Sequence, residues 1–110
     1  IGQEYRNAIS AADRHVGRLV EAVKGRGTFA QENWLILVAT DHGRTETGGH
    51  GGDSPEETTI FVIVSGPSAT QGTPAGPVSI MDVPFTALAH LGIEIREAWE
   101  LDGKVVGLNR

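Results

Sequence analysis

The segment Asn33-Trp-Leu-Ile-Leu-Val-Ala-Thr40 is a continuous apolar run that ends in a polar residue. Leu, Ile and Val without alternation are typical of a strand that is covered on both faces, as in parallel sheets. A second run of this kind spans Thr58 to Ser65 and is closed by Gly66 and Pro67. The two runs predict two buried strands of one parallel or mixed sheet, joined by a polar, glycine-rich loop over residues 41–57.

Two helices are predicted, one before and one after these strands. Apolar residues recur at helical spacing from Gln3 to Lys24. A second helix is expected from Ser79 or Asp82 to about Leu91, with Gly92 ending it. The order helix, strand, loop, strand, helix predicts an α/β fold in which helices flank a layered sheet. The apolar stripe of the first helix comprises Tyr5, Ile9, Ala12, Val16, Leu19, Val20 and Val23.

Composition excludes several classes of function. The 110 residues carry a net charge of −5 and no block of basic residues, so binding to a nucleic-acid polymer is not expected. The longest apolar run, at Trp34–Ala39, is far short of the ~20 residues that cross a bilayer, so no membrane span is expected. There is no cysteine, so any metal must be held by histidines and carboxylates.

The predicted elements are too few for a complete domain of this kind. Two strands covered on both faces require further strands and helices, and sheets commonly have about four or more strands. The tail from Ile93 to Arg110 adds at most a short strand near Lys104–Val106. The first residue is Ile1, not Met. We therefore expect residues 1–110 to be one side of a larger sheet, cut from a bigger catalytic domain.

The loop after the first strand carries the residues with the clearest chemistry. Asp41 and His42 come directly after the strand, at the edge where open α/β sheets bind ligands. Gly43 permits a turn that lets both side chains converge on one ion. A carboxylate and a neutral imidazole suit Zn²⁺, Mn²⁺ or a similar divalent metal. His50, between two pairs of glycines, is a candidate ligand for the same ion or for a neighbour about 4 Å away.

The same loop residues also have a simpler interpretation, without a metal. An Asp-His pair in a loop is often a turn residue next to a surface imidazole, and a glycine-rich loop is often only a flexible connection. The combination of a buried strand, Asp-His-Gly at its end, Gly-Gly-His-Gly-Gly and another buried strand favours a metal site.

The sequence resembles the C-terminal part of the alkaline phosphatase superfamily, in particular its type I phosphodiesterase and nucleotide pyrophosphatase branch. The resemblance spans nearly the whole chain, and Asp-His-Gly followed by His-Gly-Gly is its most specific part. It implies an alkaline phosphatase-like layered sheet with flanking helices, present here as a C-terminal fragment. The matching pieces are Tyr5–Val23, Leu35–Gly43, His50–Gly52, Ile60–Gly66, Ile80–Gly92 and Leu101–Gly103.

The resemblance also implies a two-metal hydrolase of small-molecule phosphate esters. Asp41 and His42 would bind the metal that activates the nucleophile, and His50 would bind the second metal. The metals would be two divalent ions, with Zn²⁺ favoured over Mn²⁺. The nucleophilic Ser or Thr and the remaining ligands would lie upstream of Ile1. Many such proteins are periplasmic or secreted and others are cytoplasmic, so the compartment stays open.

Two alternatives remain at this point. A sulfatase of the same superfamily has a similar arrangement but usually carries a Lys shortly after the His, and Gly51–Thr59 contains none. A non-catalytic structural or assembly fragment would self-associate through its exposed sheet edges, because unpaired strand edges template pairing.

Other polar and aromatic residues receive structural interpretations. Thr45 and Ser54 have no neighbouring base in the sequence, so no catalytic residue is nominated within the chain. Arg44 follows the metal motif and could contact a phosphate, but a surface role is favoured. Structural or solvated roles are expected for His15 and His90, and packing roles for Trp34 and Trp99. Asp53, Glu56 and Glu57 are expected to solvate the loop or begin the second strand, and Asp82 to cap a helix.

Overall fold

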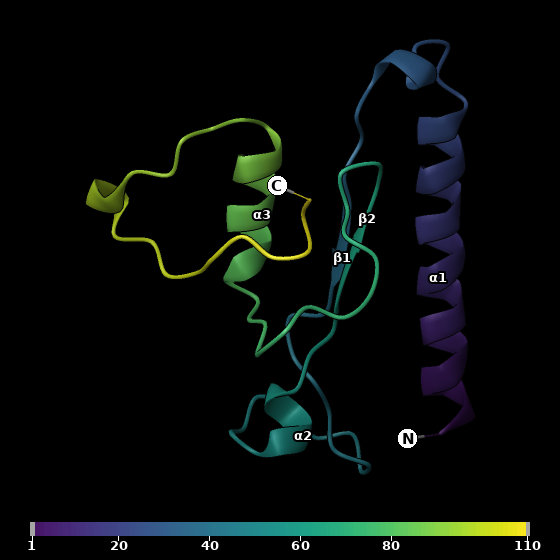
Figure 1. Ribbon diagram of the computed structural model, residues 1–110. Helices are drawn as coiled ribbons and strands as arrows, with labels where there is room; N and C mark the ends of the chain where they lie inside the picture. The colour runs from purple at the N-terminus through teal and green to yellow at the C-terminus, as the bar shows by residue number, and fades with distance from the viewer. Residues whose placement is uncertain (1, 110) are drawn as a thin grey trace.

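The computed structural model describes residues 2–109. A two-stranded sheet lies between a long N-terminal helix on one side and a shorter helix with the C-terminal segment on the other (Figure 1). The elements in chain order are α1 (Gln3–Lys24), the 3-10 helix η1 (Phe29–Gln31), β1 (Ile36–Ala39), the one-turn helix α2 (Pro55–Thr58), β2 (Val62–Ser65), α3 (Asp82–His90) and the 3-10 helix η2 (Glu97–Trp99).

The two strands pair antiparallel, with Ile36 opposite Ser65 and Ala39 opposite Val62. This antiparallel pair is compatible with the mixed sheet that the sequence allows and not with an all-parallel one. Parallel neighbours require a crossover that carries the chain back along the sheet. The connection over residues 40–61 instead turns back at the end of β1. Both strands are half-buried at most, and β2 alternates between half-buried and exposed positions.

The helix α1 begins and ends where its apolar spacing predicts, at Gln3 and Lys24. None of its described residues is buried. Val16, Val20 and Val23 are half-buried against the sheet side, whereas Leu19 is 68% exposed. The amphipathic pattern therefore predicts the helix correctly, but the apolar face of the helix is not closely packed against another element.

The second predicted strand begins later than expected, at Val62 instead of Thr58. Residues Pro55–Thr58 form α2, in which the Ser54 side chain accepts a hydrogen bond from the Glu57 N–H and proline occupies the first turn. Serine as N-cap followed by proline is a local start signal for a helix. This short helix ends the connecting loop and turns the chain into β2.

The most deeply buried part of the molecule lies between α3 and the C-terminal segment, residues 103–109. Asp82, Thr86 and Val106 are the buried residues of the described chain. The Lys104 N–H donates to Asp82 Oδ1 at 2.9 Å, and the Val106 N–H donates to Thr86 Oγ1 at 3.0 Å. The predicted strand near Lys104–Val106 is therefore absent, because these backbone groups bind side chains of α3 instead of a neighbouring strand.

The C-terminus of α3 is closed as its glycine predicts. Gly92 adopts a φ of +70°, and the Ile93 N–H donates to the Leu88 carbonyl at 3.0 Å. This is the left-handed closure that favours glycine after a helix. None of the helices in residues 2–109 combines the length and the apolar character that a membrane span requires.

Candidate metal centre

The candidate site begins where β1 ends, at a turn that is fixed by a backbone hydrogen bond before it and another after it. The Thr40 N–H donates to the Phe61 carbonyl at 3.3 Å, which continues the strand pairing by one residue. The Gly43 N–H donates to the Glu57 carbonyl at 2.7 Å. A Cβ at Gly43 would collide with the Glu56 carbonyl oxygen, so only glycine fits this close approach. Asp41 and His42 therefore sit on a fixed turn.

The structure brings the two predicted histidines together. The His42 and His50 rings stack with centroids 5.0 Å apart and planes inclined by 17°. Asp41 lies beside His42, with its Oδ1 atom 3.8 Å from His42 Nε2, and its side chain is largely exposed. The two imidazoles thus meet at one end of the sheet, although eight residues separate them in the sequence.

Hydrogen bonding orients the His42 ring for binding through one nitrogen. The Gly43 carbonyl lies 2.6 Å from His42 Nδ1. A carbonyl oxygen only accepts, so Nδ1 carries the proton and donates. Nε2 of a neutral ring then keeps its lone pair, which is the usual arrangement of a metal-binding imidazole.

The loop that carries His50 is closed by Thr45. The Gly48 N–H donates to the Thr45 carbonyl at 3.0 Å, and the Gly49 N–H donates to Thr45 Oγ1 at 2.8 Å. Gly48 and Gly51 adopt φ values of +92° and +90°, which β-carbon-bearing residues rarely take. These two glycines allow the chain to reverse and return His50 to His42.

Glu57 binds the other end of this loop. Its carboxylate accepts a hydrogen bond from Ser54 Oγ at 2.7 Å and one from the Gly52 N–H at 3.1 Å. The hydrogen bonds from the Ser54 hydroxyl and the Gly52 N–H lower the pKa of Glu57. Any side chain at Gly52 would meet this carboxylate. The expectation that Glu57 only solvates the loop or begins β2 is therefore wrong.

Arg44 is half-buried and contacts two other parts of the protein. Its Nη1 donates to the Gly48 carbonyl at 2.9 Å, and its guanidinium lies 5.5 Å from the centre of the Tyr5 ring. This cation–π contact ties the glycine loop to the first turn of α1. The arginine is thereby a link between two segments that are far apart in the sequence.

The donor set fits a divalent ion in part. In tetrahedral zinc sites with bonds of about 2.1 Å, two donor atoms lie about 3.4 Å apart, somewhat less than the 3.8 Å between Asp41 Oδ1 and His42 Nε2. Within residues 2–109, however, no group of three or more histidine, aspartate or glutamate side chains is placed to hold one ion. The Asp41 side chain is 90% exposed. The described residues supply an incomplete ligand set.

Other predicted roles have structural outcomes. His90 Nε2 lies 2.7 Å from the Asn33 carbonyl and ties α3 to the chain before β1, which confirms a structural role. The predicted helix-capping role of Asp82 is wrong: the N-cap position of α3 is Met81, without a side-chain cap, and Asp82 accepts instead from the Ser79 N–H, which precedes the helix, at 2.9 Å. It stands at the first residue of α3 itself and is buried, because its other oxygen binds Lys104.

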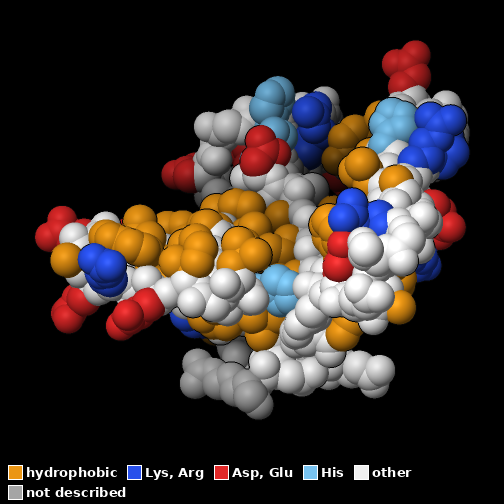
Figure 2. Space-filling view, turned by 90° about the horizontal axis from the view of Figure 1, so that it is seen from above, with side chains coloured by type: hydrophobic (Ala, Val, Ile, Leu, Met, Phe, Trp, Pro, Cys, Tyr) orange, Lys and Arg blue, Asp and Glu red, His pale blue; other side chains and the backbone are white. Residues whose placement is uncertain are grey.

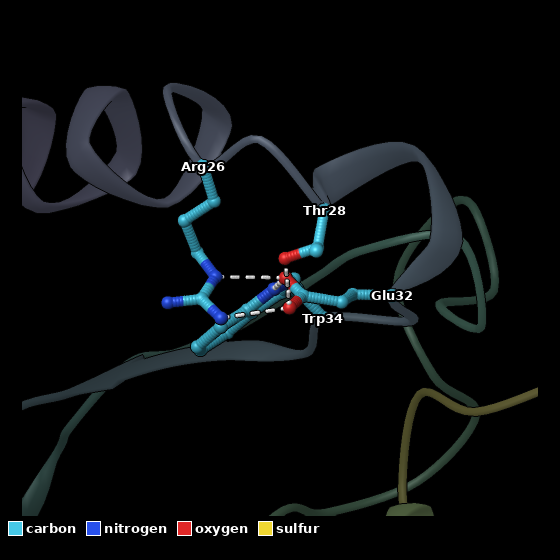
Figure 3. Close-up of polar contacts among 4 residues, drawn as sticks. All are labelled: Arg26, Thr28, Glu32 and Trp34. Carbon is cyan, nitrogen blue, oxygen red and sulfur yellow. Dashed lines mark hydrogen bonds and ion pairs between the residues drawn. The ribbon is translucent and has the colours of Figure 1, made fainter.

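A second polar cluster, which sequence reasoning missed, lies at the opposite end of β1 (Figure 3). Glu32 accepts two hydrogen bonds from Arg26 at 2.7 and 2.8 Å, one from Thr28 and one from the Trp34 indole N–H at 2.6 Å. The hydrogen bonds from Arg26 and then from Thr28 and Trp34 hold the pKa of Glu32 far below its ordinary value. The cluster joins the end of α1 to β1, and its members satisfy one another.

Comparisons of this chain with protein-family models, with curated proteins and with solved structures found no match.

Proposed function

We propose that the chain is part of a metal-dependent hydrolase of small-molecule phosphate esters, of the phosphodiesterase or nucleotide pyrophosphatase type. The observation that supports this best is the stacked pair His42 and His50, with Asp41 beside it, at the end of β1. A carboxylate and imidazoles with a free ring nitrogen are the donors that Zn²⁺ and Mn²⁺ accept.

The stacking favours two metal ions over one. The lone pair of an imidazole nitrogen lies in the plane of the ring. Two nearly parallel rings with centroids 5.0 Å apart cannot both direct such lone pairs at one ion about 2.1 Å away. They can serve two neighbouring ions, and phosphoryl-transfer sites hold two metals about 4 Å apart. Asp41 and His42 would serve one ion and His50 the other.

Each part of the chain has a role in this proposal. Bound metals would lower the pKa of an attacking hydroxyl and offset the charge on the phosphate oxygens. The Gly43 carbonyl keeps the proton on His42 Nδ1 and so leaves Nε2 free. Thr45 and Glu57 hold the two ends of the loop and position His50.

The attacking group is not among the hydroxyls near the site. Ser54 Oγ donates to Glu57, and Thr45 Oγ1 is bound to Gly49. The carboxylate beside Ser54 has a lowered pKa and is therefore a weak base, and among the described residues Thr45 Oγ1 contacts only Thr47 and Gly49. We therefore expect little or no hydrolysis from residues 1–110 alone, and appreciable turnover of a nitrophenyl phosphodiester with Zn²⁺ would contradict this part of the proposal.

Calorimetric titration with Zn²⁺ tests the metal site. The wild-type chain and His15→Ala, a matched change at an exposed histidine on α1, should bind Zn²⁺ alike. His42→Ala and His50→Ala should each lose one bound ion. Unchanged stoichiometry in both site variants would overturn the proposed centre.

Inorganic phosphate then tests the substrate class. Phosphate should bind to the Zn²⁺-loaded chain and not to the metal-free chain, because the metals supply the positive charge that the acidic chain lacks. Phosphorus NMR line broadening would report this binding. Zn²⁺ loading without any binding of phosphate would contradict a phosphate-ester hydrolase.

A further inference from the structure

Cation–π contacts join both ends of α1 to the chain on either side of β1. The helix itself has no buried residue among those described, and hydrophobic side chains form a broad exposed band over the molecule as seen from above (Figure 2). Just after its C-terminus, the Arg26 guanidinium lies 5.4 Å from the centre of the Trp34 ring, before β1. In its first turn, Tyr5 makes the same kind of contact with Arg44, after β1. Since close packing does not fix α1, these contacts at its ends help to place it.

A cleft separates the first turn of α1 from the glycine-rich loop, and the Arg44 side chain reaches across it. The cleft has a volume of about 440 Å³ and is lined by residues 2–5, Arg44 and residues 46–48. The guanidinium of Arg44 lies over the Tyr5 ring and donates from Nη1 to the Gly48 carbonyl at 2.9 Å. A planar guanidinium can donate hydrogen bonds in its plane while its face covers an aromatic ring, and an ammonium group has no such plane. Arg44 therefore serves both sides of the cleft at once.

The pair Gly48 and Gly49 is hydrogen-bonded through all four of its backbone polar groups. The Gly48 N–H donates to the Thr45 carbonyl, and the Gly49 N–H donates to Thr45 Oγ1. The Thr45 N–H in turn donates to the Gly49 carbonyl at 3.0 Å. These three bonds close the loop on itself, whereas the bond from Arg44 to the Gly48 carbonyl connects the closed loop to α1. Because His50 follows directly, the placement of this closed loop determines where its imidazole lies.

The charges around the cleft disfavour a phosphate site at Arg44. Glu4 and Glu46 line the same cleft, so its lining carries more negative than positive charge. The Arg44 guanidinium is also engaged by the Gly48 carbonyl and the Tyr5 ring. A role within the protein therefore fits Arg44 better than contact with an anionic substrate.

We propose that Arg44 is a positioning residue, which together with Tyr5 holds His50 against His42. His50 is exposed, so packing does not fix its ring, and yet the two imidazoles stack with centroids 5.0 Å apart. The connection from α1 through Arg44 to the closed loop supplies the missing restraint. Its functional meaning rests on the proposed metal centre, in which His50 binds the second ion. The first turn of α1 thereby controls one of the two metal positions without contacting either ion.

Nuclear Overhauser effects between the His42 and His50 rings test the positioning in the metal-free chain. Tyr5→Leu removes the aromatic ring and keeps a good helix former, so the effect between the two imidazoles should weaken. Tyr5→Phe keeps the aromatic ring and should retain the wild-type effect. The Gly49 amide, which is bonded within the loop, should exchange with solvent at the wild-type rate in both variants.

Three results of this experiment would overturn the proposal. An unchanged effect between the imidazoles in Tyr5→Leu would show that the contact does not position His50. An equal loss in Tyr5→Phe would assign the restraint to the hydroxyl and not to the ring. Faster exchange of the Gly49 amide along with the loss would mean that the loop unfolds, whereas positioning requires it to move as a closed unit.

Titration with Zn²⁺ separates this proposal from the proposed function. In Tyr5→Leu, the affinity for the ion at His50 should fall about two- to fivefold, the equivalent of one exposed cation–π contact. The affinity for the ion at Asp41 and His42 should not change, and Tyr5→Phe should bind both ions as wild type does. An equal fall at both ions would contradict a specific effect on His50. A chain that shows the expected Overhauser effects but binds no Zn²⁺ would refute the metal centre and still support the positioning of His50.

Discussion

The two sides of the sheet are stabilised in different ways. On the α3 side, buried side chains of the helix bind the backbone of the C-terminal segment, and Asp82 and Thr86 each hold one of its amides. On the α1 side, a longer and strongly amphipathic helix contributes no buried residue. The comparison shows that an apolar stripe is enough to specify a helix. Burial depends on whether the chain also supplies the surface to cover it.

The largest loss of stability is expected on the α3 side, from Asp82→Ala. This change removes the acceptor of two amide hydrogen bonds, from Ser79 and Lys104, at a site that is 3% exposed. A hydrogen bond to a charged group contributes about 1.5–3 kcal/mol, so we expect the loss of two to lower the free energy of unfolding by about 3 kcal/mol, measured by urea denaturation. Asp82→Asn keeps one acceptor oxygen and should lose less. Equal losses would show that the hydrogen bonds are not the cause.

Thr86→Val should cost about 1–3 kcal/mol on the same side. The hydroxyl of Thr86 is fully buried and accepts from the Val106 N–H at 3.0 Å, and valine has the same shape without an acceptor. Thr86→Ser retains the hydroxyl and should restore the contact at the cost of one methyl group. A serine variant no more stable than the valine variant would contradict this role.

Matched truncations compare the two sides directly. Val106→Ala should destabilise the protein by about 1–2 kcal/mol, because Val106 is the buried apolar side chain of the described core. Val20→Ala on α1 should cost less than about 1 kcal/mol, since Val20 is half-buried. Urea denaturation gives both values. Similar costs would show that α1 is packed as closely as α3.

At the candidate site, Glu57→Gln should weaken Zn²⁺ binding about tenfold, the usual effect of removing an outer contact that orients a ligand. The substitution removes the charge that binds Ser54 and Gly52, and so loosens the loop that carries His50. The exposed neighbour Glu56 provides the control variant, Glu56→Gln. Equal Zn²⁺ affinities of the two variants would argue against the positioning role.

The smallest effect is expected from the exposed cluster around Glu32, and it depends on pH. The pKa of Glu32 lies below its ordinary value of 4.5, so the carboxylate stabilises the folded state above pH 4.5. That stabilisation is lost as the pH falls below 4.5 toward the folded-state pKa. At pH 7 the wild type should therefore have a higher melting temperature than Glu32→Gln. This difference in melting temperature should shrink below pH 4. A difference that is constant with pH would contradict the assignment.

Much of the site was predictable because its signals are local. Asp41, His42 and His50 were identified from their positions after a strand and between glycines, and the structure does bring the two imidazoles together. The role of Glu57 was not predictable in this way. A glutamate near a turn is ordinarily solvated, and only the return of the loop places Ser54, Gly52 and His50 around its carboxylate.

The same distinction separates the helices from the sheet. The bounds of α1 and the glycine closure of α3 follow from apolar periodicity and backbone preference, which act over a few neighbouring residues. Other features depend on contacts between residues more than 20 positions apart. These are the antiparallel pairing of β1 with β2 and the hydrogen bond from the Lys104 N–H to the buried Asp82. Short-range preferences cannot encode such contacts, because the same apolar run satisfies either strand direction and the same aspartate either caps a helix or binds a distant amide.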